Sequence, residues 1–211
     1  MNEPTVKRAE VLEDLVPTPK YSALLFDWDG TVADSQGVNF EVLCEAMAGH
    51  DLRLDREWFD SHTGTSTADA IRLVAAEQGK SADPDLIADQ RNALFLNRVA
   101  DVDLVDHMRD LIDGNQGRLK MAVASGGDGN CLMATLNARN YRSSFDAIVT
   151  RDDVSAGKPS PEIFRKAANL LDVAPSECLV YEDSDEGIEA ARLANMDVID
   201  VRPLRRAVLG Y

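Results

Sequence analysis

Residues 23–31 have the sequence ALLFDWDGT, in which two carboxylates one residue apart follow a short apolar run. A run of this length bounded by turn formers is typical of a buried strand in a parallel sheet, and Gly30 supplies the boundary. Asp27 and Asp29 would then lie at the carboxyl end of the strand, where open α/β sheets bind ligands. Alternation directs both side chains to one side, so they would repel each other unless a cation or proton lay between them. The stretch therefore indicates Mg²⁺ and phosphate chemistry, although a solvated Asp-Gly turn fits the same residues.

The composition describes an acidic globular chain. Its 211 residues are 45% hydrophobic, which is enough for one large domain or two smaller ones. The sequence has 37 acidic and 22 basic residues, which gives a net charge of −15. Such a charge repels a polyanion, and the largest basic cluster, Arg202 with Arg205 and Arg206, is too small to outweigh it. We therefore expect no nucleic-acid partner.

The cysteines and the hydropathy bear on the compartment. Cys44, Cys131 and Cys178 are odd in number and far apart, which favours free thiols in a reducing cytoplasm. No apolar run approaches the length of a bilayer span, and the first residues lack the apolar core of a signal peptide. We expect a cytoplasmic protein with no membrane partner, present as a monomer or a weak homodimer.

The periodicity of apolar residues divides the chain into two kinds of structure. Residues 36–100 are helical in pattern, and no strand signal interrupts them. From about residue 104 helices and strands alternate, which implies a parallel sheet. The expected strands are 121–124, 147–149, 178–181 and 198–201, and the expected helices are 104–112, 131–138, 163–171 and 187–194. The predicted fold class is α/β: a Rossmann-like parallel sheet core with a helical cap inserted after the first strand.

The domain organisation follows from this pattern. We expect residues 21–35 and 101–211 to form the core, residues 36–100 the cap and residues 1–20 an N-terminal extension. The crossings near residues 33–37 and 99–103 are natural hinges, so cap movement would admit substrate and then exclude water. The extension has apolar residues near helical spacing before two prolines, and is expected to be a docked segment or a frayed tail.

Three later segments carry polar groups next to a strand or a helix. Ser125 and Gly126 follow the strand at 121–124 and offer a hydroxyl and backbone N–H groups that can hold an anion. Lys158 lies between a glycine and a proline ahead of a helix, from where it can neutralise phosphoryl oxygens or carboxylates. Glu182 and Asp183 follow the strand at 178–181, and Mg²⁺ needs little more from a protein than one carboxylate from each of two strands and a carbonyl. Each signal alone also fits an empty turn, a surface lysine or a helix cap.

Together and in this order, the four signals resemble the motifs of the haloacid dehalogenase superfamily of phosphohydrolases. The match covers about residues 22–35 and 104–201, and the helical insertion lies where many members carry their cap. Residues 157–164, GKPSPEIF, and the EDS of residues 182–184 are similar to the beta-phosphoglucomutase-like subgroup. Residues 191–202 also resemble fructose-1-phosphate phosphatase-like sugar phosphatases, on weaker signals.

The resemblance implies a reaction and a set of residues. Asp27 would attack phosphorus and form an aspartyl-phosphate, and Asp29 would carry the proton to and from the reacting oxygens. The implied catalytic residues are Asp27, Asp29, Ser125 and Lys158. The implied Mg²⁺ ligands are Asp27, the Asp29 carbonyl and Asp183, with Glu182 acting either through water or through contact with the other ligands. The implied substrate-binding residues are Gly126 and, in the cap, Gly64, Thr65 and Ser66. The implied partner is a small phosphorylated metabolite.

Three rival functions share the core. A 2-haloacid dehalogenase usually lacks the second acid, so Asp29 argues against it. A hexose-phosphate mutase needs cap residues that hold a bisphosphate, and the family's cap histidine and arginine are here Asn39 and Thr67. A non-enzymatic regulator is disfavoured because every motif side chain is present. The cap loop at residues 63–67 is equally consistent with a helix N-terminus capped by Ser66 or Thr67. We therefore predict Mg²⁺-dependent hydrolysis of small phosphate monoesters, such as sugar phosphates.

Overall fold

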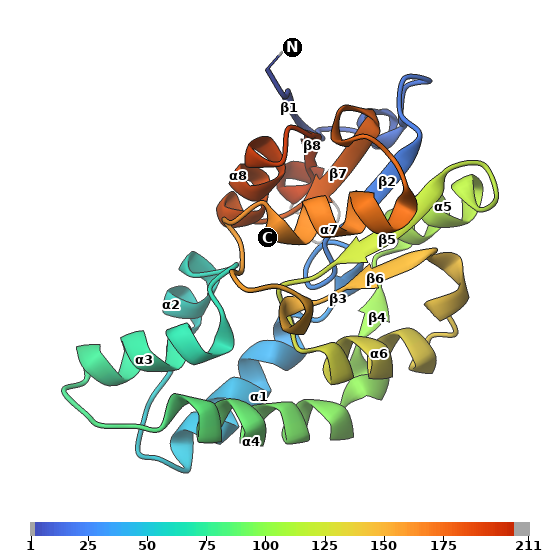
Figure 1. The fold of residues 1–211 in the computed structure, drawn as a ribbon. Helices are drawn as coiled ribbons and strands as arrows, with labels where there is room; N and C mark the ends of the chain where they lie inside the picture. The colour runs from blue at the N-terminus through green and yellow to red at the C-terminus, as the bar shows by residue number, and fades with distance from the viewer. Residues whose placement is uncertain (1–2, 205–211) are drawn as a thin grey trace.

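β2 (Ala23–Phe26) lies inside a six-stranded parallel sheet with the strand order β1-β8-β7-β2-β5-β6. The computed structural model describes residues 3–204. Every residue of β2 is buried, because the strand has a neighbour on each edge and helices on both faces (Figure 1). The predicted α/β class with a parallel core sheet is therefore confirmed.

The elements follow one another in the alternating order that the sequence predicts. The remaining strands are β1 (Val6–Arg8), β3 (Ala33–Asp34), β4 (Asp103–Leu104), β5 (Lys120–Ala124), β6 (Ala147–Val149), β7 (Cys178–Glu182) and β8 (Asp197–Asp200). The helices are α1 (Gln36–Ala48), α2 (Arg56–Ser61), α3 (Thr67–Glu77), α4 (Pro84–Asn97), α5 (Asp106–Asn115), α6 (Gly129–Ala138), α7 (Glu162–Leu171) and α8 (Asp185–Leu193). Short 3₁₀ turns connect several of them.

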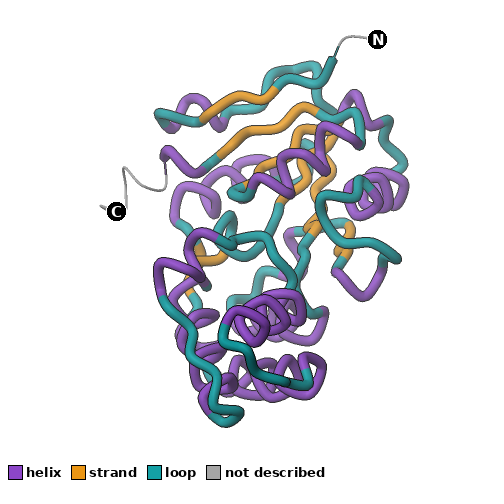
Figure 2. The backbone as a smooth tube through the Cα atoms, turned by 90° about the vertical axis from the view of Figure 1, so that its left-hand side faces the viewer, coloured by secondary structure: helices purple, strands orange, loops and turns teal. Residues whose placement is uncertain are grey.

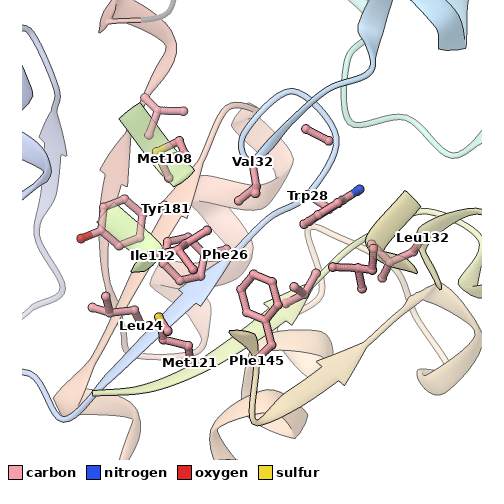
Figure 3. Packing of buried hydrophobic residues seen from close by; sticks show 14 of the residues in the cluster. Leu24, Phe26, Trp28, Val32, Met108, Ile112, Met121, Leu132, Phe145 and Tyr181 are labelled. Carbon is pink, nitrogen blue, oxygen red and sulfur yellow. The ribbon is translucent and has the colours of Figure 1, made fainter. Parts of the chain in front are cut away.

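The two faces of the sheet bury alternate residues of each strand. Leu24 and Phe26 of β2 pack on one face with α5 and α6, and Leu25 packs on the other with α7 and α8. Figure 3 shows the first cluster, in which Trp28 continues the row of Phe26 and lies beside Phe145. Trp28 is only 1% exposed, so its ring belongs to the core, on the side that alternation predicts.

The helices α1 to α4 form a separate hydrophobic cluster built on Met47, Leu52, Ile71 and Ile87. In Figure 2 these helices lie together below the strands. The chain enters this group through β3 and leaves it through β4, which pair antiparallel with Ala33 opposite Leu104. The two crossings expected to be hinges therefore run side by side. The division into core and cap remains our proposal.

The N-terminal segment differs from the expected helix. Residues 6–8 form β1, which adds to the sheet parallel to β8, and a 3₁₀ turn follows at Leu12–Leu15. Ala9 and Leu15 are buried in the core, and the Tyr181 hydroxyl donates a buried hydrogen bond of 2.7 Å to the Leu15 carbonyl. The helical prediction was wrong because the free edge of β8 offers hydrogen-bond partners that local spacing does not reveal. The N-terminal segment is therefore docked on the core sheet, which is one of the two expected alternatives.

The structure bears on two further expectations. Cys44, Cys131 and Cys178 are free thiols, as predicted. Among residues 3–204, no helix combines the length and the apolar character needed to cross a membrane. The basic cluster considered above lies partly outside the described residues, because Arg205 and Arg206 follow residue 204. Arg202 pairs with Asp200 and Asp185.

Asp197 at the start of β8 anchors the N-terminal segment. Its carboxylate accepts hydrogen bonds from the backbone N–H and hydroxyl of Thr5, from Lys20 at 2.6 Å and from the Tyr21 hydroxyl at 2.9 Å. Burial alone would raise the pKa of Asp197, but the donors from Lys20 and Thr5 lower it to about 2. The carboxylate therefore stabilises the attachment of residues 5–21 to the sheet.

We expect Asp197→Asn to lower the free energy of unfolding by about 1–3 kcal/mol, because an amide cannot accept all four bonds. Urea unfolding at neutral pH measures the loss, and Asp89→Asn, which removes an exposed charge, serves as the control. The contribution is complete above the unfolded-state pKa of about 3.9 and is lost as the pH falls through about 2. The gap between wild type and Asp197→Asn should therefore narrow over that range, and a gap that stays constant would contradict the assignment.

Candidate active site

Three adjacent strands deliver the predicted site residues to one edge of the sheet. β2 pairs with β7 on one side and with β5 on the other, in parallel and with matched ends. Asp27 follows β2, Ser125 follows β5 and Glu182 ends β7. Because all three strands run in the same direction, their carboxyl ends meet, and the polar residues after them share one pocket.

A tight turn after β2 returns the chain past Asp29. The Trp28 carbonyl accepts hydrogen bonds from the N–H groups of Thr31, Val32 and Ala33 at 2.9–3.2 Å. Gly30 has a φ of +87°, a conformation that side chains disfavour. The glycine of the motif is thus required by the backbone, and the turn holds Asp29 beside Asp27 at the pocket.

Lys158 supplies the positive charge between two buried carboxylates. Its ammonium lies 2.6 Å from Asp27 Oδ1 and 2.5 Å from Glu182 Oε1. Burial alone would lower the pKa of Lys158, but the charges of Asp27 and Glu182 raise it above its ordinary value. Burial raises the pKa of Asp27 above its usual range, against the opposing charge of Lys158. The lysine is therefore a charged member of the site rather than a surface group.

Glu182 is fully buried and has all its contacts inside the protein. Its Oε2 accepts hydrogen bonds from the backbone N–H groups of Asp183 and Ser184 and from the Ser184 hydroxyl, at 2.8–3.0 Å. Ser184 in turn caps α8 by accepting from the N–H of Gly187. Glu182 thus fixes the loop after β7 and the position of Lys158 together.

The acids of the site could hold a divalent cation. Asp27, Glu182 and Asp183 are buried, and each offers a carboxylate oxygen within 4.8 Å of the others. Oxygen donors of this kind suit Mg²⁺, which binds one or two carboxylates and keeps several waters. Three buried acids beside one lysine also leave excess negative charge, which a cation would offset. The residues present therefore fit a Mg²⁺ ion.

Asp29 is held by residues that follow it in the chain. Its Oδ1 accepts a hydrogen bond of 2.5 Å from the Ser35 hydroxyl and one of 3.1 Å from the Asn39 side-chain amide. Its Oδ2 faces Gly127, where a Cβ atom would lie 3.2 Å away. One oxygen of Asp29 is thus occupied, while the other faces the turn after β5.

The turn after β5 places groups that could hold an anion at the pocket. Ser125 is 1% exposed, and its hydroxyl accepts a hydrogen bond of 3.0 Å from the N–H of Gly127. α6 begins directly afterwards, with Asp128 as its cap, so the positive end of the helix dipole lies close by. Gly126 lines the same pocket. The predicted anion-binding turn therefore lies beside Asp27 and Asp29.

Helices α1 to α4 and the loops between them supply the opposite wall of the pocket. Gly64, Thr65, Ser66 and Thr67 all line it, and substrate binding by the first three stays a prediction. Gly64 has a φ of +96°, and a Cβ there would overlap with the Glu186 carboxylate, so the glycine lets this loop reach the core. The Ser66 hydroxyl caps α3 by accepting from the N–H of Asp69, which realises the helix-cap alternative as well.

Several pocket residues escaped the sequence analysis. Trp58 and His62 stack with ring centroids 3.9 Å apart, and with Phe59 they form an aromatic wall in α2 and the loop after it. Arg91 of α4 also lines the pocket. An amphipathic pattern predicts which residues are buried, but not which of them border a cavity, so neither the wall nor Arg91 had a local signal.

We expect Gly187→Ala to abolish the site, because a Cβ on residue 187 would overlap with the Glu182 carboxylate. Displacing Glu182 should lower the free energy of unfolding by about 1–3 kcal/mol, as in other overpacked cores, and should break the ion pair with Lys158. Thermal unfolding and activity measure both effects. Gly114→Ala in α5 is the matched control, since nothing lies within 4 Å of a Cβ there. Normal stability and activity of Gly187→Ala would refute this role of the glycine.

Comparison with known proteins agrees with the geometry. The family model described as haloacid dehalogenase-like hydrolase matches residues 24–201. The chain is 32% identical to the fructose-1-phosphate phosphatase YqaB of Escherichia coli over 88% of its own length and 98% of the relative. It is 26% identical to the beta-phosphoglucomutase of Bacillus subtilis, over 85% of this chain and 82% of that one.

A solved structure shows the same fold. The crystal structure of CbbY from Rhodobacter sphaeroides in complex with phosphate superposes with a TM-score of 0.78 at 27% identity, covering 86% of each chain. These relatives confirm the resemblance that the motifs indicate. On the match over residues 24–201 and these similarities, the chain belongs to the haloacid dehalogenase-like hydrolase family.

Proposed function

We propose that this hydrolase cleaves small phosphate monoesters, with sugar phosphates as the substrate class, in a Mg²⁺-dependent reaction through an aspartyl-phosphate. Its enzyme class, phosphoric monoester hydrolase, follows from the family and from the phosphatases among its relatives. The observation that carries the proposal is the pairing of Asp27 with Lys158 beside Asp29 and the turn after β5. We place this activity in the cytoplasm.

Asp27 is the nucleophile of the proposed reaction. Its carboxylate attacks phosphorus, the bond to the ester oxygen breaks, and the phosphoryl group is left on Asp27. A covalent intermediate divides one difficult displacement into two easier ones. Lys158 holds Asp27 Oδ1 and orients the carboxylate toward the pocket. Water then attacks the phosphorus of the aspartyl-phosphate, the P–O bond to Asp27 breaks, and inorganic phosphate leaves, which restores the carboxylate.

Asp29 moves the proton in both steps. In the first step it donates a proton to the departing alkoxide, and in the second it accepts one from the attacking water. Its Oδ1 is occupied by Ser35 and Asn39, so Oδ2, which faces Gly127, is the atom that exchanges the proton. The same residue thus serves as acid and base without a second group.

The transferring oxygens would bind where the structure concentrates donors and positive charge. The Ser125 hydroxyl and the N–H group of Gly126 can donate to them, next to the N-terminus of α6. Lys158 adds a full positive charge from the other side. Asp27, the Asp29 carbonyl and Asp183 would hold Mg²⁺, with Glu182 acting through water. The bound ion would offset the negative charges of the Asp27 carboxylate and the phosphoryl group.

The leaving group would lie against the cap. The hydroxyls of Thr63, Thr65 and Thr67 and the aromatic wall of Trp58 and Phe59 line that side of the pocket. Hydroxyls suit the polar edge of a sugar, and an aromatic ring suits its C–H face. The similarity to a fructose-1-phosphate phosphatase supports this class of substrate.

A phosphate-release screen over sugar phosphates and phosphoglycolate, with and without Mg²⁺, tests the proposal. We expect phosphate release from at least one sugar phosphate. Phosphate release should stop when EDTA removes the metal and should resume when Mg²⁺ is added back. Asp27→Asn is the control: activity should fall at least about 10³-fold, and no acid-labile phosphoryl-protein should form. Full activity of Asp27→Asn, or release independent of metal, would overturn the mechanism. Isomer formation from a hexose 1-phosphate would indicate a mutase, and halide release from 2-haloacids a dehalogenase.

We expect Asp29→Asn to lose about 10²–10⁴-fold in turnover of an alkyl phosphate, because an amide cannot protonate the leaving oxygen. Metal binding should persist, since the backbone carbonyl of residue 29 is retained. Steady-state kinetics and calorimetric titration with Mg²⁺ measure the two properties separately. Unchanged hydrolysis of a substrate with a poor leaving group would contradict the role of Asp29 as proton donor.

A further inference from the structure

The His62 side chain lies in the pocket wall that α2 and the loop after it form. It lines the same pocket as Asp27 and Asp29, although no step of the proposed reaction uses it. Its ring stacks on the Trp58 indole, with centroids 3.9 Å apart and planes 8° apart. The indole N–H of Trp58 donates to the Glu77 carboxylate of α3 at 3.2 Å. The plane of the His62 ring is therefore fixed by contacts that involve two helices of the insertion.

The backbone of α2 decides which nitrogen of His62 carries the proton. Nδ1 lies 2.8 Å from the Trp58 carbonyl oxygen, one turn back along the chain. A carbonyl oxygen can only accept a hydrogen bond, so Nδ1 must be the donor. The Ser61 hydroxyl lies 3.1 Å from Nδ1 and donates to the same carbonyl at 2.8 Å, so it leaves this assignment unchanged. In the neutral ring, Nε2 is then an acceptor with a free lone pair.

Nε2 of His62 has no hydrogen-bond partner within residues 3–204. Because the Nδ1 edge of the ring faces its own helix, Nε2 lies at the opposite edge. It is thus the polar atom that this side chain can offer to the pocket. An acceptor in a pocket wall stabilises a ligand that brings a hydrogen to it, and disfavours a ligand that leaves it unpaired. Nε2 therefore suits the hydroxyl group of a ligand.

The other groups on this wall fit the same kind of ligand. Thr63, Thr65 and Thr67 line the pocket, and their hydroxyls have no hydrogen-bond partner in the described part of the chain. A hydroxyl can donate or accept, so these three groups complement the fixed acceptor. The residues between 58 and 67 that line the pocket include no lysine, arginine or carboxylate. This wall therefore recognises hydroxyl groups and not a second charge on the ligand.

The loop after His62 lies close to the reacting groups. Gly64 packs so tightly on the loop after β7 that a Cβ there would lie 3.1 Å from Ser184 Cβ. Ser184 follows Asp183, one of the acids that could hold Mg²⁺. The two residues from His62 to Gly64 span at most about 7 Å, which is comparable with the length of a sugar. A phosphoryl group at Asp27 and a hydroxyl at His62 can therefore belong to one substrate.

We propose that His62 is a specificity-determining residue whose Nε2 accepts a hydrogen bond from a hydroxyl of the leaving group. The class of leaving group is uncharged and polyhydroxylated, such as a sugar or a sugar alcohol. This role rests on the proposed function, because it concerns the alcohol that the reaction releases. Trp58 acts through His62, since it fixes the plane of the ring. An ester without hydroxyls leaves Nε2 unpaired and is a poorer substrate.

Two esters with carbon chains of equal length test the proposal. Glucitol 6-phosphate carries hydroxyls along its chain, and n-hexyl phosphate has none. The measured quantity is the preference, defined as kcat/KM on glucitol 6-phosphate divided by kcat/KM on hexyl phosphate. His62→Phe keeps a flat ring beside Trp58 but has no acceptor. We expect it to lower the preference by about 5–50-fold, because a hydroxyl of the substrate is left unpaired. His62→Gln offers an amide oxygen in place of Nε2 and should keep more of the preference.

A control variant and a spectroscopic measurement complete the experiment. His50→Phe is the matched control, because His50 also contacts another helix of the insertion, through Gln90 at 2.9 Å, but does not line the pocket. Its preference should equal that of the wild type, and thermal unfolding verifies that each variant is folded. Long-range ¹H–¹⁵N NMR should show that the neutral His62 ring carries its proton on Nδ1. The His62 signals are identified by their absence from the spectrum of His62→Phe.

Several results would overturn the role of His62 while the proposed function stands. They are a proton on Nε2 of the neutral ring, an unchanged preference in His62→Phe, and a lower preference in His62→Gln than in His62→Phe. A loss in His50→Phe as large as that in His62→Phe would reduce the effect to packing of the helices. A wild type that acts no better on glucitol 6-phosphate than on hexyl phosphate would also overturn it. A wild type that releases no phosphate from any ester overturns the proposed function and this role with it.

Discussion

The site depends on the ammonium of Lys158 between Asp27 and Glu182. Both acids are almost completely buried, and charges removed from water are tolerated only when they are paired and hydrogen-bonded. The lysine comes from the loop between β6 and α7, so its two ion pairs connect that loop to the ends of β2 and β7. Three segments of the chain are thereby held in one arrangement. In the proposed reaction, the same arrangement orients the Asp27 carboxylate before substrate arrives, which lowers the cost of positioning it.

A second network holds Asp29, the proposed proton carrier. Ser35 follows β3 at the crossing into the cap, Asn39 lies one turn further on, and both donate to the same oxygen of Asp29. Asp27, the proposed nucleophile, is thus held by residues of the sheet edge, and Asp29, the proposed proton carrier, by residues at and after the crossing into the helical insertion. In the proposed function, this division would let substrate contacts from the loop at residues 63–67 and from the aromatic residues of α2 change, while the residues at the strand ends keep the phosphoryl chemistry constant.

The sequence identified the residues that meet at the strand ends because each of their signals is local. Asp27, Ser125 and Glu182 each come directly after an apolar run, and a strand followed by a polar turn can be recognised within about ten residues. The N-terminal segment was misassigned because β1 exists only through pairing with β8, almost the whole chain away. Arg91 and Trp58 lay in helices whose apolar spacing predicts burial, and burial alone does not show which face borders a pocket.

By itself the sequence determined the α/β pattern, the helical insertion and the residue types at each strand end, because short-range periodicity and turn chemistry encode them. Only the tertiary structure decided that β2 lies between β5 and β7, which brings those strand ends together. It also decided that the Asn39 side chain of α1 donates to Asp29 and accepts a hydrogen bond from Arg91 of α4. Strand order and contacts between distant helices arise from packing of the whole chain, and no local pattern specifies them.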